Sequence, residues 1–154
     1  MVKRLSEDAR KLVLAAAADE ARRRGDRRVG TDHLLLGLLH DPTDEVASAL
    51  GVDLASARAA EDALDRAALA AVGIDAGDLG PVAEAAGARR PALTSGARAV
   101  LKGAVEQARA TRSRRIETRH LLLALLACER PDPAAQLLHE LRVDAAAVRA
   151  RLAG

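Results

Sequence analysis

The sequence predicts an all-α fold, and two features of its composition and an internal duplication lead to that prediction. Of the 154 residues, 37 are Ala and 24 are Leu, the strongest helix formers. Residues that favour strands are scarce, because the chain has 11 Val, 2 Ile and no Phe, Trp or Tyr. Hydrophobic residues still make up 49% of the chain, which is enough for a sizeable core of Leu, Val and Ala.

The duplication lies at a constant shift of 87 residues. Segment 13–39, VLAAAADEARRRGDRRVGTDHLLLGLL, matches segment 100–126, VLKGAVEQARATRSRRIETRHLLLALL, at 14 of 27 positions without a gap. A shorter echo follows in each half, LGVDLASAR and then LRVDAAAVR. Neither half has much core of its own. We therefore expect an eight-helix globule made of two four-helix repeats with pseudo-twofold symmetry.

A long helix opens each half. Ser6 and Thr94 are the expected N-caps, because a hydroxyl oxygen can accept one of the free backbone N–H groups at a helix start. These helices are expected to end near Arg24 and Thr111. Gly25 is a natural stop for the first of them.

The second helix of each half starts at Thr31 or Thr118, where the hydroxyl is again expected to accept a free N–H of its own helix. It continues through the Leu-rich segments 34–39 and 121–126. These segments are apolar on nearly all sides, so we expect them to be buried.

Two shorter patterns complete each half. A third helix is expected at about 45–50 and 133–141. A fourth opens after Asp53 or Asp144, where a carboxylate caps the helix and complements its dipole. This pattern gives four helices per repeat and eight in all.

Helix-breaking residues separate the two halves. We expect one domain, with a first repeat at about 5–72, a linker at about 73–92 and a second repeat at about 93–153. The breakers of the linker are Gly73, Gly77, Gly80, Pro81, Gly87 and Pro91.

Net charge and targeting signals limit which partners and which cellular location we expect. The 24 basic residues nearly balance the 22 acidic ones, so the net charge gives little support for nucleic-acid binding. The missing aromatic rings also remove stacking platforms for single strands. No apolar run is long enough for a membrane span, and the first residues lead into an amphipathic pattern and not into a signal peptide. We expect a cytoplasmic protein with no membrane contact.

Groups that could do chemistry are few. His33 and His120 stand at equivalent places before the Leu blocks, and with no adjacent Cys they are expected to be structural and not metal ligands. The single Cys128 follows an apolar helix and is expected to be an ordinary buried thiol. We expect no enzymatic activity, no cofactor and no metal. The acidic side chains of the first helix are expected to be solvated partners of nearby Arg residues: Glu7, Asp8, Asp19 and Glu20.

The string EARRRGDRRVGTDHLLLGLL resembles the Clp N-terminal repeat, usually written EARxLGHxxIGTEHLLLGLL and found doubled at the front of ClpA- and ClpC-type unfoldases. The resemblance covers essentially the whole chain. It implies an eight-helix domain that docks protein substrates, adaptors and peptide antibiotics. No G-x-x-x-x-G-K-[ST] phosphate loop is present, so we expect a stand-alone ClpC-like N-domain without the ATPase ring.

The resemblance also implies a ligand site at the two Thr-x-His motifs. In ClpC-type members, the Glu of Gly-Thr-Glu-His contacts the guanidinium of phosphoarginine, and the phosphate lies near a helix start. The first repeat retains a carboxylate in Gly30-Thr31-Asp32-His33. The second reads Glu117-Thr118-Arg119-His120, where Arg119 would repel a guanidinium unless Glu117 substitutes. We expect at most one phosphoarginine pocket.

Simpler interpretations stand beside these. Asp32 in a first helical turn can serve only to offset the helix dipole. The basic clusters are either a solvated rim or an anion-binding rim that includes Arg27, Arg28, Arg114 and Arg115.

The sequence thus favours a non-catalytic module that binds peptide or protein clients, including arginine-phosphorylated ones. Its partners would include a Clp unfoldase or its adaptor, for which it would act as adaptor, competitor or peptide-antibiotic decoy. The absence of aromatic residues weakens the decoy hypothesis. The alternative is a small basic helical protein that contacts nucleic acid through its Arg-rich loops.

Overall fold

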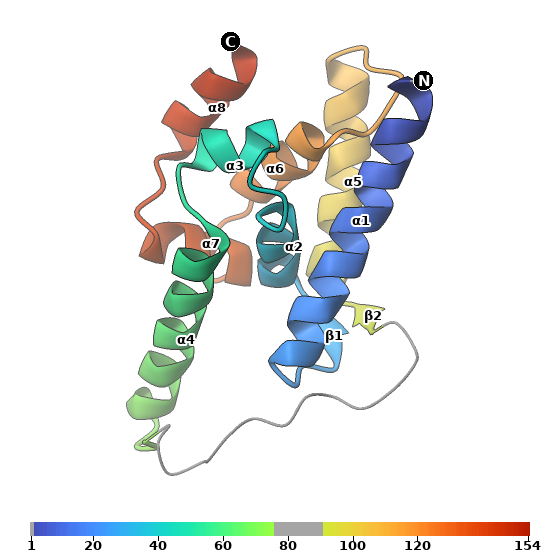
Figure 1. The fold of residues 1–154 in the computed structure, drawn as a ribbon. Helices are drawn as coiled ribbons and strands as arrows, with labels where there is room; N and C mark the ends of the chain where they lie inside the picture. The colour runs from blue at the N-terminus through green and yellow to red at the C-terminus, as the bar shows by residue number, and fades with distance from the viewer. Residues whose placement is uncertain (1, 76–90) are drawn as a thin grey trace.

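A computed structural model describes residues 2–75 and 91–154, and over these residues the two halves fold in the same way (Figure 1). Each half contributes four helices, which confirms the predicted all-α fold of two four-helix repeats. The first half holds α1 (Val2–Arg23), β1 (Arg28–Val29), α2 (Thr31–Leu38), α3 (Glu45–Leu50) and α4 (Leu54–Ala71). The second holds β2 (Ala92–Leu93), α5 (Ser95–Ala110), α6 (Thr118–Leu126), α7 (Pro133–Glu140) and α8 (Ala145–Ala153).

Most of the predicted helix starts are confirmed. Thr94 caps α5 by accepting a hydrogen bond from the backbone N–H of Ala97 at 3.0 Å. Asp53 and Asp144 cap α4 and α8 with their carboxylates. The predicted cap at Ser6 is wrong, because α1 already begins at Val2. The Lys, Arg and Leu residues that precede Ser6 are good helix formers, and they extend the helix past the expected start.

The two Leu-rich helices lie at the centre of the molecule. The first three Leu residues of α2, 34–36, are at most 1% exposed, and Leu122 and Leu125 of α6 are fully buried. Helices of the two halves pack on one another: α7 lies against α2, and α8 lies against α3. The core is therefore shared between the repeats. The predicted division into repeats and linker stays a prediction, and residues 76–90 of that linker lie outside the described residues.

A short parallel strand pair links the two halves at the start of α2. Arg28 and Val29 of β1 pair with Ala92 and Leu93 of β2. The backbone N–H of Thr94 then donates to the carbonyl oxygen of Val29 at 2.9 Å. This pairing brings the start of α5 next to the loop that leads into α2.

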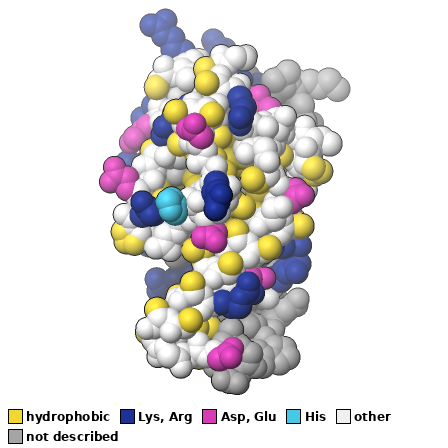
Figure 2. Space-filling view, turned by 90° about the vertical axis from the view of Figure 1, so that its left-hand side faces the viewer, with side chains coloured by type: hydrophobic (Ala, Val, Ile, Leu, Met, Phe, Trp, Pro, Cys, Tyr) yellow, Lys and Arg dark blue, Asp and Glu magenta, His cyan; other side chains and the backbone are white. Residues whose placement is uncertain are grey.

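The surface is mixed in charge. On the face shown in Figure 2, basic and acidic side chains alternate with small apolar patches. None of the helices in the described part of the chain is long and apolar enough to cross a membrane.

Candidate functional site

Each Thr-x-His motif forms the first turn of a helix whose backbone is capped by the histidine ring. His33 Nδ1 accepts a hydrogen bond from the backbone N–H of Gly30 at 2.8 Å, and its Nε2 lies 2.8 Å from Asp26 Oδ2. His120 Nδ1 accepts from the N–H of Glu117 at 2.8 Å in the same way. Both rings are buried, and burial lowers the pKa of His120. The geometry agrees with the structural role predicted for these residues.

The two threonines of the motifs do not cap their own helices, as the sequence had suggested. Gly30 and Glu117 occupy the N-cap positions, so the threonines are already the first helical residues. The hydroxyl of Thr31 instead donates to Asp132 Oδ1 at 2.8 Å and accepts from the N–H of Ala134 at 3.1 Å. It therefore helps to cap α7 of the other repeat and has little capacity left for a ligand.

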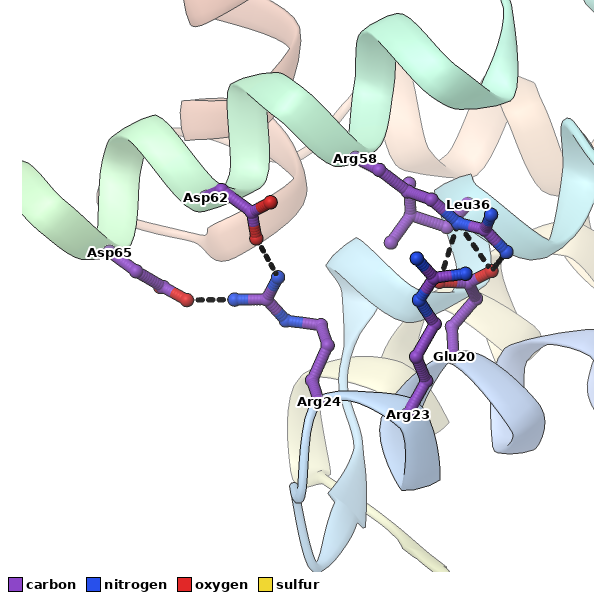
Figure 3. Close-up of a pocket in the computed structure, with 7 residues that line it drawn as sticks. All are labelled: Glu20, Arg23, Arg24, Leu36, Arg58, Asp62 and Asp65. Carbon is purple, nitrogen blue, oxygen red and sulfur yellow. Dashed lines mark hydrogen bonds and ion pairs between the residues drawn. The ribbon is translucent and has the colours of Figure 1, made fainter. Parts of the chain in front are cut away.

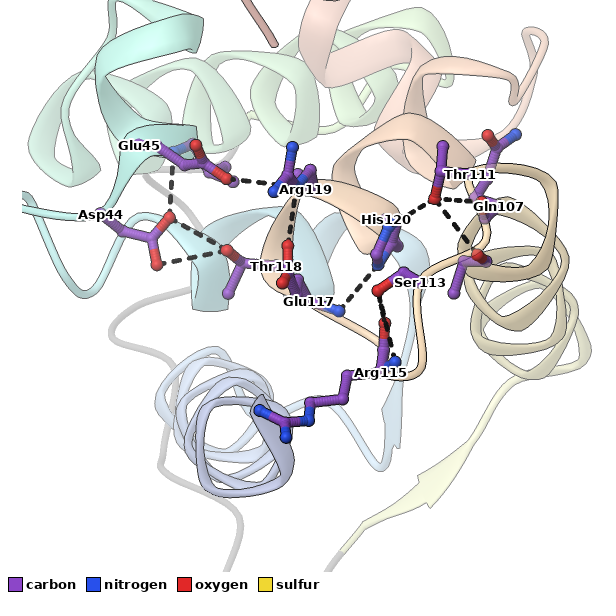
Figure 4. Close-up of polar contacts among 12 residues, drawn as sticks. Asp44, Glu45, Gln107, Thr111, Ser113, Arg115, Glu117, Thr118, Arg119 and His120 are labelled. Atoms are coloured by element: carbon purple, nitrogen blue, oxygen red, sulfur yellow. Dashed lines mark hydrogen bonds and ion pairs between the residues drawn. The ribbon is translucent and has the colours of Figure 1, made fainter. Parts of the chain in front are cut away.

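Thr118 makes the reciprocal contact in the second repeat. Its hydroxyl donates to Asp44 Oδ1 at 3.0 Å, and Asp44 is the N-cap of α3 in the first repeat (Figure 4). The same kind of bond thus crosses between the repeats in both directions. This reciprocal capping gives both threonines a structural role that does not depend on ligand binding.

Asp32 is the motif residue whose side chain faces another acid. Its side chain is 13% exposed, and its carboxylate lies within hydrogen-bonding reach of Glu61 on α4. Glu61 is buried, and its Oε2 atom has no hydrogen-bond partner among the described residues. Burial, and then the neighbouring Asp32, raise the pKa of Glu61 to about 9. Glu61 is therefore protonated at neutral pH, next to Asp32.

A surface pocket of about 310 Å³ lies at the start of α2. Three of the predicted ligand-site residues line it, namely Gly30, Thr31 and Asp32, and their binding of a ligand stays a prediction. It adds residues that sequence reasoning had not placed there. The remaining lining residues are Arg28, His33, Thr94, Gly96, Asp132 and Pro133. The lining of the pocket thus includes one arginine, Arg28, and two acids, Asp32 and Asp132.

The second repeat presents different electrostatics at the equivalent place. Arg119 Nε lies 2.7 Å from Glu117 Oε2 and 3.6 Å from Glu45 Oε1, so its charge is met by two acids (Figure 4). The contact with Glu117 raises the pKa of Arg119. Glu117 is thereby held by its own neighbour, and it does not stand ready for an external guanidinium.

The four Arg residues of the predicted basic rim differ in exposure and in their place relative to the pocket. Arg27 and Arg28 are exposed in the loop and strand before α2, and Arg28 lines the first-repeat pocket. Arg114 is exposed in the corresponding loop of the other repeat, whereas Arg115 is partly buried. Neither Arg114 nor Arg115 lines that pocket, so only Arg28 of the four joins the candidate site.

Comparison with known proteins identifies the architecture. A family model described as the Clp repeat (R) N-terminal domain matches residues 4–84 and 92–154. The chain belongs to the Clp N-terminal repeat family. The resemblance drawn from the duplicated Thr-x-His and Leu motifs is therefore confirmed.

The relatives of this Clp N-terminal domain are much longer proteins. Two of them, from Guillardia theta and Porphyra purpurea, are described as ATP-dependent Clp protease ATP-binding subunit ClpA homologues. Each is 32% identical over 155 residues, and the match covers 99% of this chain and 17% of the relative. The N-terminal domain of the Caseinolytic protease associated chaperone ClpD from Arabidopsis thaliana has the same fold, with a TM-score of 0.65 and 23% identity. That match covers 93% of this chain and 91% of the other.

The Clp N-terminal domain also contains a buried ion pair that sequence reasoning missed. Glu20 of α1 is 1% exposed, which overturns the prediction that it is solvated. Its Oε1 atom lies 2.5 Å from Nη2 of Arg58 on α4 (Figure 3). The same atom lies 2.9 Å from Nε2 of His40. Burial alone would raise the pKa of Glu20, but these two partners outweigh burial and lower it. Asp19, by contrast, pairs with Arg22 at 2.9 Å on the surface, as predicted.

A second ionic contact ties the same helices together beside this pair. Arg24, near the end of α1, reaches Asp62 and Asp65 of α4 (Figure 3). These contacts hold α4 next to the end of α1. Glu61, on the same helix, therefore lies next to Asp32 at the start of α2. The sequence signal for Glu61 is weak, since a Glu next to Asp62 in a helix rich in Ala and charged residues is typical of a surface residue.

Cys128 fits the expected role of an unreactive thiol. It is partly buried, and its Sγ atom lies 3.6 Å from the carbonyl oxygen of Ala124. Burial, followed by the negative charge of Asp132, raises its pKa to about 11. A thiol with so high a pKa is a poor nucleophile at neutral pH.

Proposed function

We propose that this domain is a non-catalytic docking module that binds peptide segments of protein clients, and that the pocket at the start of α2 takes an arginine side chain carrying a phosphate group. The observation that carries the proposal is that one pocket is lined by both an acid, Asp32, and an arginine, Arg28. A phosphoarginine side chain has the complementary arrangement, because it joins a cationic guanidinium to an anionic phosphate.

We place the guanidinium of phosphoarginine at Asp32 and its phosphate at Arg28, and the chemistry of both groups supports this orientation. Carboxylates accept charge-assisted hydrogen bonds from a guanidinium, and Arg28 can donate to a phosphate. The first turn of the eight-residue helix α2 adds the positive end of a helix dipole near the phosphate. The pairing of Arg119 with Glu117 supports a single site in the first repeat.

The relatives suggest the partner that would receive the client. They are described as ATP-binding subunits of a Clp protease, and this domain matches 17% of their length. We propose that it hands clients to a Clp unfoldase in the cytoplasm, or competes with the unfoldase's own N-domain for them. The role of a peptide-antibiotic decoy has less support, because the chain has no aromatic side chain for an apolar cyclic peptide to stack on.

Amide NMR titration of the labelled domain tests the ligand. The probes are free phosphoarginine, arginine and inorganic phosphate, with intrinsic fluorescence replaced by NMR because the chain has no Trp or Tyr. Selective, saturable shifts at residues 29–34 that disappear in Asp32→Ala support the proposal. Equal shifts with phosphate alone, or no shifts, would overturn it. Binding that ignores Asp32→Ala but falls steeply between low and physiological salt would instead indicate contact with polyanions such as nucleic acid.

A further inference from the structure

The most unusual group in the described part of the molecule is the carboxyl of Glu61. It lies on the inner side of α4, where the residue is 6% exposed. Its neighbour is another acid, Asp32 at the start of α2, and its Oε2 atom has no donor among the described residues. A buried ionised carboxylate without a hydrogen-bond donor is strongly disfavoured. A proton shared between the two carboxyls removes that cost.

The surroundings of the pair are mostly acidic. Two residues of the loop after α1 act on the pair: Asp26 adds a negative charge, and Arg24 adds a positive one. Arg24 is itself occupied by Asp62 and Asp65 on the outer side of α4. The helix α7 also packs on α4, but its titratable residues His139 and Glu140 are exposed. Within the described part of the chain, the nearest cation to the acid pair, Arg24, is thus already paired with other carboxylates.

Asp32 connects this buried acid to the open pocket. It is one of the residues that line the pocket, and its carboxylate is within hydrogen-bonding reach of Glu61, which does not itself line the pocket. A cation that enters the pocket and contacts Asp32 therefore also comes near the Glu61 carboxyl. The positive charge favours the ionised form of Glu61, and the proton then moves to solvent.

We propose that Glu61 is a positioning residue for Asp32 and that it makes binding of a cationic side chain in this pocket proton-coupled. In the free domain, the Glu61 proton is shared with Asp32 and holds its carboxylate in place. In the bound domain, a guanidinium or ammonium group takes the place of that proton, and one proton passes to the buffer for each ligand bound. The inference rests on the proposed function, because it concerns the same pocket.

Linkage fixes the direction of the effect. Since binding releases a proton, affinity for the cationic ligand rises with pH below the point where free Glu61 ionises. Full release of one proton gives about a tenfold rise in affinity per pH unit. The pKa of about 9 for Glu61 places neutral pH inside this range.

The test measures phosphoarginine affinity by NMR at three pH values between about 6 and 8, with calorimetry in buffers of different ionisation enthalpy to count released protons. Glu61→Gln mimics the protonated carboxyl in shape and charge, so it is expected to fold and to bind. Asp62→Asn is the matched control, because it removes the adjacent carboxylate on the exposed side of the same helix. We expect the wild-type domain and Asp62→Asn to show the pH slope and the proton release, and Glu61→Gln to show neither.

Two results overturn the inference and differ from one another. Saturable binding with no proton release, or an unchanged pH slope in Glu61→Gln, removes the role of Glu61 and leaves the proposed function intact. No saturable binding of phosphoarginine at any pH in any variant removes the proposed function and the inference with it.

Discussion

The hydroxyl of Thr31 in the first repeat donates to Oδ1 of Asp132 in the second, across 101 positions of sequence. Asp132 is the N-cap of α7, and Thr31 accepts one of the free N–H groups of the same helix. Thr118 and Asp44 repeat the arrangement in the opposite direction. Each repeat thus completes a helix start of the other, which links the duplication to the stability of the whole domain.

Thr31→Val is therefore expected to destabilise the domain although it preserves the shape of the side chain. The substitution leaves a buried N–H and a carboxylate oxygen without one of their partners, and we expect a loss of about 1–3 kcal/mol in the free energy of unfolding. Urea unfolding followed by far-UV circular dichroism measures it. Thr43→Val is the control, because the Thr43 hydroxyl meets Asp41 on the exposed surface. Equal stability of the two variants would show that the cross-repeat bond contributes little.

The helices and the core followed from the sequence because their causes are local. Asp53, Asp144 and Thr94 cap the helices that begin directly after them, and each Leu block is apolar on nearly all sides. Such patterns are complete within one stretch of chain. The duplication then indicated that the two halves share one arrangement.

The candidate site was only partly predictable, because its decisive contacts join distant residues. Gly30, Thr31 and Asp32, which the motif singles out, all line one pocket. Their partners Glu61 and Asp132 belong to other helices, and nothing in the spacing brings them to the motif. The same holds for Glu20, whose partner Arg58 lies 38 positions away. Sequence patterns fix which face of a helix is apolar, but they do not identify a buried polar partner.

Glu61 is expected to make the stability of the domain depend on pH. Its pKa is about 9 in the folded chain and near 4.5 in the unfolded chain, so between these values the folded state holds one more proton. Stability from this group is therefore complete below about pH 4.5 and falls as the pH rises towards 9. Glu61→Gln removes this dependence, so its margin over the wild type in the free energy of unfolding is expected to grow by about 1.4 kcal/mol per pH unit, from less than about 1 kcal/mol at pH 5 to about 4–5 kcal/mol at pH 8.

Urea unfolding at several pH values measures that difference, and Asp62→Asn again serves as the control. The control loses an exposed contact with Arg24, so its offset from the wild type is expected to stay nearly constant with pH. A Glu61→Gln offset that does not grow between pH 5 and pH 8 would mean that Glu61 is ionised in the folded domain.

The central Leu residues are expected to tolerate no charge. Leu35 is 1% exposed and Leu122 is fully buried, so Leu35→Asp or Leu122→Asp places a carboxylate in a core of Leu and Ala. The cost of several kcal/mol is comparable to the total stability of a small domain, and we expect both variants to unfold. Circular dichroism and thermal melting report the loss. Leu12→Asp is the control, because Leu12 is 70% exposed. Retention of the melting temperature by Leu35→Asp would contradict the core assignment.

In each repeat, the first two helices approach closely because one of them carries a small residue at the contact. The small residue Gly lies on α2 in the first repeat and on α5 in the second. A Cβ atom added at Gly37 of α2 would lie 2.8 Å from the carbonyl oxygen of Val13 and 3.1 Å from the backbone nitrogen of Ala17, so α1 and α2 would have to separate. The second repeat carries Ala124 at the matching place, and Gly103 of α5 faces it. There an added Cβ would meet only the Cβ of Ala124, at 3.3 Å.

Gly37→Ala is therefore expected to lower the free energy of unfolding by about 1–3 kcal/mol despite the better helix propensity of Ala. Gly103→Ala makes a milder contact with a side chain, and the gain in propensity of up to about 1 kcal/mol offsets much of it. Thermal melting of both variants measures the difference. Gly37→Ala places a methyl group against backbone atoms, whereas Gly103→Ala places one against another methyl group. If Gly37→Ala melts at or above the wild-type temperature, α1 can move away from α2 at little cost, and the close helix contact is not what requires glycine there.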